Sequence, residues 1–215
     1  MNTQALPVKM NRLAVWLFNP FTYLAGWQAL MLGVILIIGT ALLGSVGNVH
    51  FDGVLDMHMG AEAPLWFFIA EGFIDWLSLA IYLWIAGLIV RGSAFRMVDV
   101  FGTQALARWP MLLSAAAGIL PANQRVTEEL MKIVQNPGQP PVLALEPIDV
   151  IVFAMAMIII LVTIIWMIVL MYRAYAVSCN LKGAKAFVSF IICLLVAEAM
   201  SKLGLYTIIK LFPLN

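Results

Sequence analysis

Five long stretches of the chain are apolar enough to cross a lipid bilayer as helices. A helix that spans a bilayer needs about 20 consecutive, mainly apolar residues. The third stretch contains Gln104 and Arg108, and Pro110 predicts a kink within it. Arg108 lies close to one end, so its side chain is expected to extend to the interface. The pattern predicts an all-α membrane bundle of five transmembrane helices, with residues 1–215 as a single domain. The predicted spans cover residues 24–46, 65–90, 101–120, 148–171 and 186–209.

Shorter patterns lie before the first stretch and between the third and fourth. Residues 10–17 place apolar side chains at helical spacing, and Asn19-Pro20 ends the run. This predicts either a short interfacial helix or the start of the first span. Residues 123–134 have the pattern of an amphipathic helix. Ala29 and Gly33 form a small-xxx-small pair, which predicts a close contact between helices.

The composition excludes an ordinary soluble protein. Hydrophobic residues make up 64% of the chain and charged residues 11%, against about 25% charged residues in typical soluble domains. The formal net charge is +1, which gives no sign of nucleic-acid binding. The lipid bilayer is therefore the first partner that the sequence predicts.

Basic residues gather in alternate connections, and this asymmetry predicts an orientation. The N-terminal tail and the second and fourth connections contain most of them, whereas the first connection has neither Lys nor Arg. The positive-inside rule then places the N-terminus in the cytoplasm and the C-terminus outside. We expect a multi-pass protein of the inner (cytoplasmic) membrane. The basic residues behind this prediction are Lys9, Arg12, Arg91, Arg96, Arg173, Lys182 and Lys185.

Four charged residues lie within two of the predicted spans. Glu71 and Asp75 are one turn apart in the second, and Glu198 and Lys202 are one turn apart in the fifth. A charge within the bilayer costs about 2.5–3.5 kcal/mol on insertion scales, so each of these residues needs a reason. Counting along the helices places Glu71 level with Lys202 and Asp75 level with Glu198. We therefore expect an ion pair in the first case and a shared proton in the second.

Two interpretations of this intramembrane charged cluster stay open at this stage. The charges lock the helices together, as paired polar groups do in many membrane bundles. Alternatively, Glu71, Asp75 and Glu198 carry protons or ions or line a cavity for a polar substrate. The two interpretations lead to different classes of function.

The first connection offers ligands for a divalent metal ion such as zinc. Imidazole and carboxylate groups suit zinc, although their spacing here matches no known metal signature. The residues are His50, Asp52, Asp56, His58 and Glu62. The chain has no HExxH motif, no GxSxG motif and no glycine-rich phosphate loop. No residue is predicted to be catalytic, and we do not expect an enzyme.

Several short motifs lie in or beside the connections between the predicted spans. They are 19–20 (Asn-Pro), 84–87 (Trp-Ile-Ala-Gly), 91–96 (Arg-Gly-Ser-Ala-Phe-Arg), 108–110 (Arg-Trp-Pro) and 180–185 (Asn-Leu-Lys-Gly-Ala-Lys). In this combination the chain resembles the Yip (Ypt-interacting protein) domain family, in its short prokaryotic form. The resemblance covers about residues 15 to 206 and implies five spans with a cytoplasmic N-terminus. Eukaryotic relatives act in vesicle traffic and bind small GTPases, but the chain lacks their Asp-Leu-Tyr-Gly-Pro motif, so GTPase binding is doubtful here.

The sequence thus predicts a function in one of two classes. The first is a Yip-like scaffold or membrane-organising protein that binds lipids, partner helices or a second copy of itself. The second is a small transporter, or a protein that handles protons or divalent metal ions through the acidic cluster. The resemblance favours the first.

Overall fold

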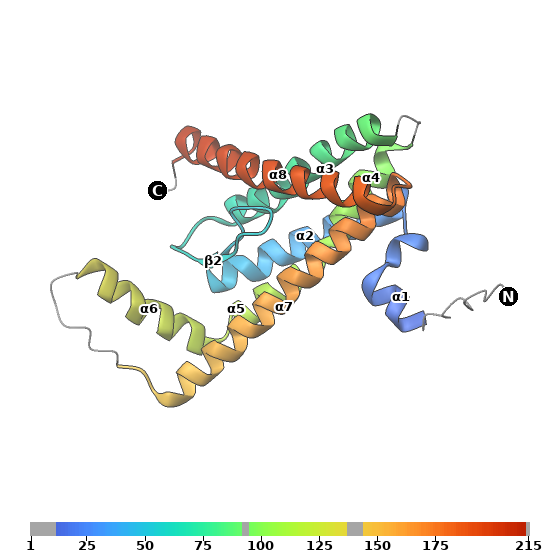
Figure 1. The fold of residues 1–215 in the computed structure, drawn as a ribbon. Coiled ribbons are helices and arrows are strands. Elements are labelled where there is room, and N and C mark those ends of the chain that lie inside the picture. Colours follow the sequence, from blue (N-terminus) through green and yellow to red (C-terminus); the bar gives the residue numbers. More distant parts are fainter. Residues whose placement is uncertain (1–11, 92–94, 137–143, 214–215) are drawn as a thin grey trace.

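The computed structural model describes residues 12–91, 95–136 and 144–213 and consists mainly of helices (Figure 1). Two ends of the molecule are distinguished below. The "hairpin end" contains the two short strands, and the "opposite end" contains the α3–α4 and α7–α8 connections. The elements are α1 (Arg12–Phe18), η1 (Pro20–Thr22), α2 (Gly26–Gly47), β1 (Val49–His50), β2 (His58–Met59), α3 (Leu65–Arg91), α4 (Met97–Ala107), α5 (Met111–Gly118), α6 (Pro121–Gln135), α7 (Pro147–Ser178) and α8 (Gly183–Leu211).

Four helices, α2, α3, α7 and α8, are each long and apolar enough to cross a membrane. The segment Met97–Gly118 meets this test only together with α6, and the two are bent by 75° at the break between them. The all-α bundle predicted from the sequence is therefore confirmed. Within the described residues it has four candidate spans, or five if the bent pair is counted.

Helices α2 and α4 approach each other closely because small residues face the contact. A Cβ added to Gly33 would lie 2.5 Å from the backbone carbon of Ala105, and one added to Gly102 would lie 2.5 Å from the carbonyl oxygen of Gly26. Ala29 is fully buried in the same region. The contact predicted from Ala29 and Gly33 is confirmed, and the partner is the third apolar segment.

The third apolar segment is interrupted where Pro110 predicts a kink. Helix α4 ends at Ala107 and α5 begins at Met111, with Arg108 between them. Proline has no backbone N–H group, which removes a helical hydrogen bond. The break places the Arg108 side chain inside the bundle, where it is 5% exposed. The predicted extension of Arg108 to the interface is therefore wrong.

Helix α1 is separate from α2 and packs against α7. The indole of Trp166 on α7 donates a hydrogen bond to the backbone carbonyl of Leu17 (2.9 Å), and its ring contacts Phe18. This confirms a short helix before the first span. Helix α6, predicted for residues 123–134, is also present and lies along α7 near the hairpin end (Figure 1).

Two short strands form a hairpin in the connection between α2 and α3. Strand β1 pairs with β2 in antiparallel register, with Val49 opposite Met59 and His50 opposite His58. Asn48 ends α2 in the left-handed conformation, with φ of 51°, and so turns the chain into β1. The hairpin brings the two histidine rings together, with their centroids 5.6 Å apart.

Candidate functional site

The polar centre of the molecule lies where the hairpin connection meets α3 and α8. Helices α3 and α8 pack against each other. The predicted contacts between their charged residues needed the two helices to be neighbours in this way. The contacts of the four charged residues nevertheless differ from those predicted. Three of them bind the connection between α2 and α3, and the fourth binds the break between α4 and α5.

Glu71 pairs with His50 rather than with Lys202. Its Oε1 lies 2.8 Å from Nδ1 of His50, and its Oε2 accepts a hydrogen bond from the backbone N–H of Phe51 (3.2 Å). The second ring nitrogen of His50 lies 2.9 Å from the carbonyl oxygen of Ala61. Glu71 is 1% exposed, so this carboxylate fixes β1 to α3 in the interior. The predicted Glu71–Lys202 ion pair is wrong.

Glu198 and Lys202 also bind the connection. Oε2 of Glu198 accepts a hydrogen bond from the backbone N–H of Leu55 (2.9 Å). Nζ of Lys202 lies 2.5 Å from Oδ2 of Asp56 and 3.4 Å from Oε1 of Glu198. Carboxylates on two different helices thus satisfy backbone donors of one connection. That arrangement holds the connection against both helices.

Asp75 lies deepest and pairs with Arg108. Nη2 of Arg108 donates to Oδ2 of Asp75 at 3.2 Å, and Asp75 is 0% exposed. Glu71 and Glu198 act on Asp75 through their charges, and the hydroxyl group of Ser201 lies beside it. Asp75 thus forms an ion pair with Arg108, whereas the sequence predicted that it shares a proton with Glu198. Arg108 is the functional candidate that sequence reasoning missed, and its place near a proline inside an apolar stretch was the available signal.

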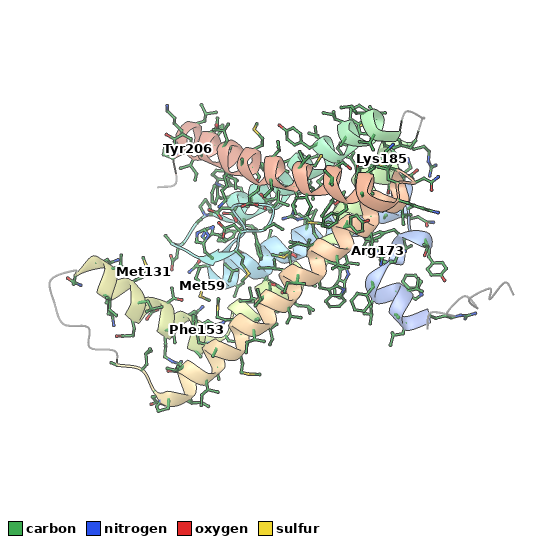
Figure 2. The ribbon with its side chains drawn as sticks, in the orientation of Figure 1. Met59, Met131, Phe153, Arg173, Lys185 and Tyr206 are labelled. Carbon is green, nitrogen blue, oxygen red and sulfur yellow. The ribbon has the colours of Figure 1, made fainter. Side chains whose placement is uncertain are left out.

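A pocket of about 470 Å³ opens at the hairpin end between the connection, α3 and α8. One part of its lining is charged or polar, and another part is apolar. The polar residues are His50, Asp52, His58, Glu62, Glu71 and Lys202, and the larger apolar and aromatic residues are Phe67, Leu205, Tyr206 and Ile209. Tyr206 lies toward the hairpin end of α8 in Figure 2, far from Lys185 near the start of that helix. Glu71 and Lys202 therefore face the same pocket without pairing.

Three of the five residues predicted to bind a metal come together. One potential ligand atom from each of Asp52, Asp56 and His58 lies within 4.8 Å of the other two. His50 does not join them because both of its ring nitrogens lie within hydrogen-bond distance of Glu71 and Ala61. Glu62 lines the neighbouring pocket but lies outside this group.

Ionisation of two groups in the connection depends on these contacts. Burial of His50 opposes its protonation, but its hydrogen bonds to Glu71 and Ala61 and the nearby carboxylates outweigh burial and raise the pKa of His50. The hydrogen bond from Lys202 is the largest influence on Asp56 and lowers the pKa of that carboxyl group. Both shifts favour the charged forms that hold the connection in place.

Comparisons of the chain with family models, with curated proteins and with solved structures find no match. The relationship to the Yip family therefore stays a prediction from the motifs. Any function must be argued from the geometry alone.

Proposed function

We propose that the protein is a non-enzymatic, membrane-organising protein of the inner membrane that binds a lipid head group in the hairpin-end pocket. The observation that carries this proposal is the two-sided lining of the pocket. Lys202 and several carboxylates face its polar part, while Phe67, Leu205 and Ile209 face its apolar part. Such a pocket suits a molecule with a charged head and an apolar body.

The height of the pocket supports a lipid as the ligand. Lys202 lies 19 residues after the start of α8, which corresponds to about 28 Å along the helix axis. The hydrocarbon core of a bilayer is about 30 Å thick. A span that begins at one interface therefore brings Lys202 to the level of the head groups of the other leaflet.

The charges in the pocket favour a zwitterionic head group that contains an amine. The ammonium group of Lys202 complements a phosphate, and the carboxylates of Asp52 and Glu62 complement a primary amine. A phospholipid with an ethanolamine head combines both groups. An anionic head without an amine would leave the carboxylates without a partner.

The proposed orientation puts this pocket in the outer leaflet. Arg173 and Lys185 lie toward the opposite end of the molecule (Figure 2). The positive-inside rule places that end in the cytoplasm, together with the N-terminus, and the C-terminus outside. Labelling of single cysteines from outside intact cells tests this orientation.

Native mass spectrometry of the purified protein with added lipids tests the head-group site. We expect phosphatidylethanolamine to bind more tightly than phosphatidylglycerol or phosphatidylcholine. Lys202→Gln should weaken the binding of all three lipids, and Glu62→Gln should reduce the preference. Lys210→Gln is the matched control because Lys210 is exposed on the same helix and does not line the pocket. Equal binding of the three lipids, or unchanged binding of all three by Lys202→Gln, contradicts the proposal.

A divalent metal ion is a second candidate ligand at the same end. Two carboxylates and one imidazole, from Asp52, Asp56 and His58, form a donor set that zinc accepts. Titration of the purified protein with Zn²⁺ alone, with the heat of binding measured by calorimetry in lipid-free detergent, tests this candidate. We expect stoichiometric binding that His58→Gln abolishes and that His50→Gln largely keeps. An absence of binding heat excludes the metal and leaves the lipid proposal untouched.

A further inference from the structure

Buried polar side chains occupy successive turns of α3 and α4 across the molecule. On α4 they follow each other from the opposite end to the break, and on α3 they continue toward the hairpin end. Each step of four residues along a helix corresponds to about 6 Å. The residues of this "polar column" are, in order from the opposite end, Asp99, Thr103, Gln104, Arg108, Asp75 and Glu71. All except Asp99 are at most 5% exposed.

Both ends of the polar column reach polar surroundings. At one end, the hydroxyl oxygens of Ser178 and Thr103 lie 2.8 Å apart, and both lie within hydrogen-bond distance of the backbone carbonyl oxygen of Asp99. The Asp99 side chain is 19% exposed and pairs with the exposed Arg96. At the other end, Glu71 lines the hairpin-end pocket. The column therefore connects the two ends of the bundle.

The centre of the column contains buried polar atoms that no group of the described residues satisfies. Oε1 of Gln104, Nη1 of Arg108 and Oδ1 of Asp75 are buried and have no hydrogen-bond partner among the described residues. Buried polar groups are almost always hydrogen-bonded, either to protein or to internal water. Two of these atoms lie one turn apart at the end of α4, and the third belongs to Asp75 on α3, which pairs with Arg108. Together they indicate internal water molecules at this place.

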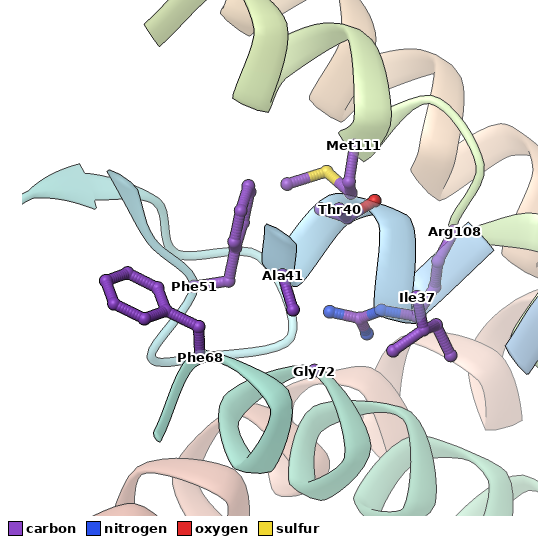
Figure 3. Close-up of a pocket in the computed structure, with 8 residues that line it drawn as sticks. All are labelled: Ile37, Thr40, Ala41, Phe51, Phe68, Gly72, Arg108 and Met111. Carbon is purple, nitrogen blue, oxygen red and sulfur yellow. The ribbon is translucent and has the colours of Figure 1, made fainter. Parts of the chain in front are cut away.

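A cavity beside Arg108 has room for such water. Its volume is about 20 Å³, and Thr40, Gly72 and Arg108 are among its lining residues. One water molecule needs about 10–15 Å³ measured with a water-sized probe. Figure 3 shows the guanidinium group between Ile37 and Ala41 of α2 and Gly72 of α3. The cavity thus lies next to the turn that separates Asp75 from Glu71.

We propose that the polar column is a proton path through the membrane, with Asp75 as the group that accepts and releases the proton. A proton from water on one side converts the Asp75 carboxylate to the carboxylic acid, and the same proton then passes to water on the other side. The charged or polar groups facing Asp75 are Arg108 at the α4–α5 break, Glu71 on its own helix, and Glu198 and Ser201 on α8. The cavity of about 20 Å³ beside Arg108 has room for one water molecule but not for a hydrated Na⁺ or K⁺ ion, which makes the path selective for protons.

Proton flux into liposomes tests this path directly. The full chain is reconstituted with a pH-sensitive dye inside, and valinomycin with a K⁺ gradient makes the interior negative. We expect acidification on the order of tenfold faster than in vesicles without protein, because each buried polar group and water lowers the barrier to a charge in hydrocarbon. A Na⁺-sensitive dye should show no protein-dependent signal.

Variants separate a path through the column from a general leak. Asp75→Asn combined with Arg108→Gln removes the titratable group without leaving a buried charge unpaired, and should return the flux to that of empty vesicles. Gln104→Leu removes one unsatisfied atom and should slow the flux even if the double variant does not fold. Asp149→Asn is the matched control because Asp149 pairs with Arg125 at the start of α7, away from the column.

Two results would overturn the proposal. One is wild-type acidification that does not exceed that of empty vesicles. The other is acidification that is equal in the wild type, in Gln104→Leu and in every folded variant of Asp75. Protein-dependent Na⁺ entry would contradict a path that only protons can follow. A failure of this test leaves the lipid proposal standing, since that proposal is tested at Lys202, which does not belong to the column.

Discussion

Removing one partner of the Asp75–Arg108 pair should destabilise the protein strongly. The two side chains are 0% and 5% exposed and joined at 3.2 Å, so Arg108→Leu leaves a carboxylate without a partner in the interior. Breaking a buried ion pair in this way costs about 3–5 kcal/mol. If Asp75 takes up a proton instead, the remaining cost is that of an unsatisfied buried group, about 1–3 kcal/mol.

Thermal unfolding in detergent, followed by tryptophan fluorescence, measures the loss. A change of 1 kcal/mol shifts the Tm of a protein of this size by about 2–4 °C, so Arg108→Leu should lower the Tm by about 6–12 °C if the full cost of about 3 kcal/mol applies. Asp75→Leu should lower the Tm similarly, because it leaves Arg108 buried and unpaired. The control is Lys132→Leu, since the Lys132 side chain is 65% exposed, pairs with Glu129 on the same helix, and its loss should change little.

The double variant Asp75→Leu with Arg108→Leu separates the pair from its two members. Replacing both partners of a buried ion pair by apolar groups is often neutral. The double variant should therefore recover most of the Tm that each single variant loses. Losses that simply add in the double variant, or single variants that melt with the wild type, would refute this account of the pair.

Two further predictions concern packing and pH. Gly102→Ala should lower stability by about 1–3 kcal/mol, measured as thermal unfolding, because the added Cβ would lie 2.5 Å from the Gly26 carbonyl oxygen. Gly39→Ala, whose Cβ would meet its nearest neighbour at 3.5 Å, should be tolerated. The raised pKa of His50 gives stability that is full below the pKa of the unfolded state and is lost as the pH rises through the folded-state pKa. The Tm should thus fall as the pH rises above about 6.5, and His50→Gln should flatten that dependence if the Glu71 contact causes it.

The pattern of apolar stretches along the chain was sufficient to predict most of the fold. Length and apolar content predicted the long helices, and Pro110 predicted the break between α4 and α5. The spacing of Ala29 and Gly33 predicted a close helix contact but could not identify α4 as the partner. Small residues show that a backbone can approach, whereas the identity of the approaching helix depends on the whole arrangement of the bundle.

The partners of the charged residues could not be read from the sequence. Glu71 and Lys202 are level along their helices, but height along a helix does not determine which way a side chain points. The partner of Glu71 is His50, which the β1–β2 pairing folds back over α3. Arg108 was misjudged because the third apolar stretch was counted from residue 101. Helix α4 begins at Met97, so Arg108 lies about 16 Å from that end, beyond easy reach of the interface.

Helix α3 links the two proposed activities through residues one turn apart. Phe67 lines the head-group pocket, Glu71 fixes the connection that covers this pocket, and Asp75 lies at the centre of the polar column. A ligand that displaces the connection would weaken the His50–Glu71 contact and expose Glu71 to water. The charge of Glu71 acts on Asp75, so a change in its hydration alters the electrostatic environment of the proposed proton acceptor. Lipid binding and proton movement, if both occur, should therefore influence each other through α3.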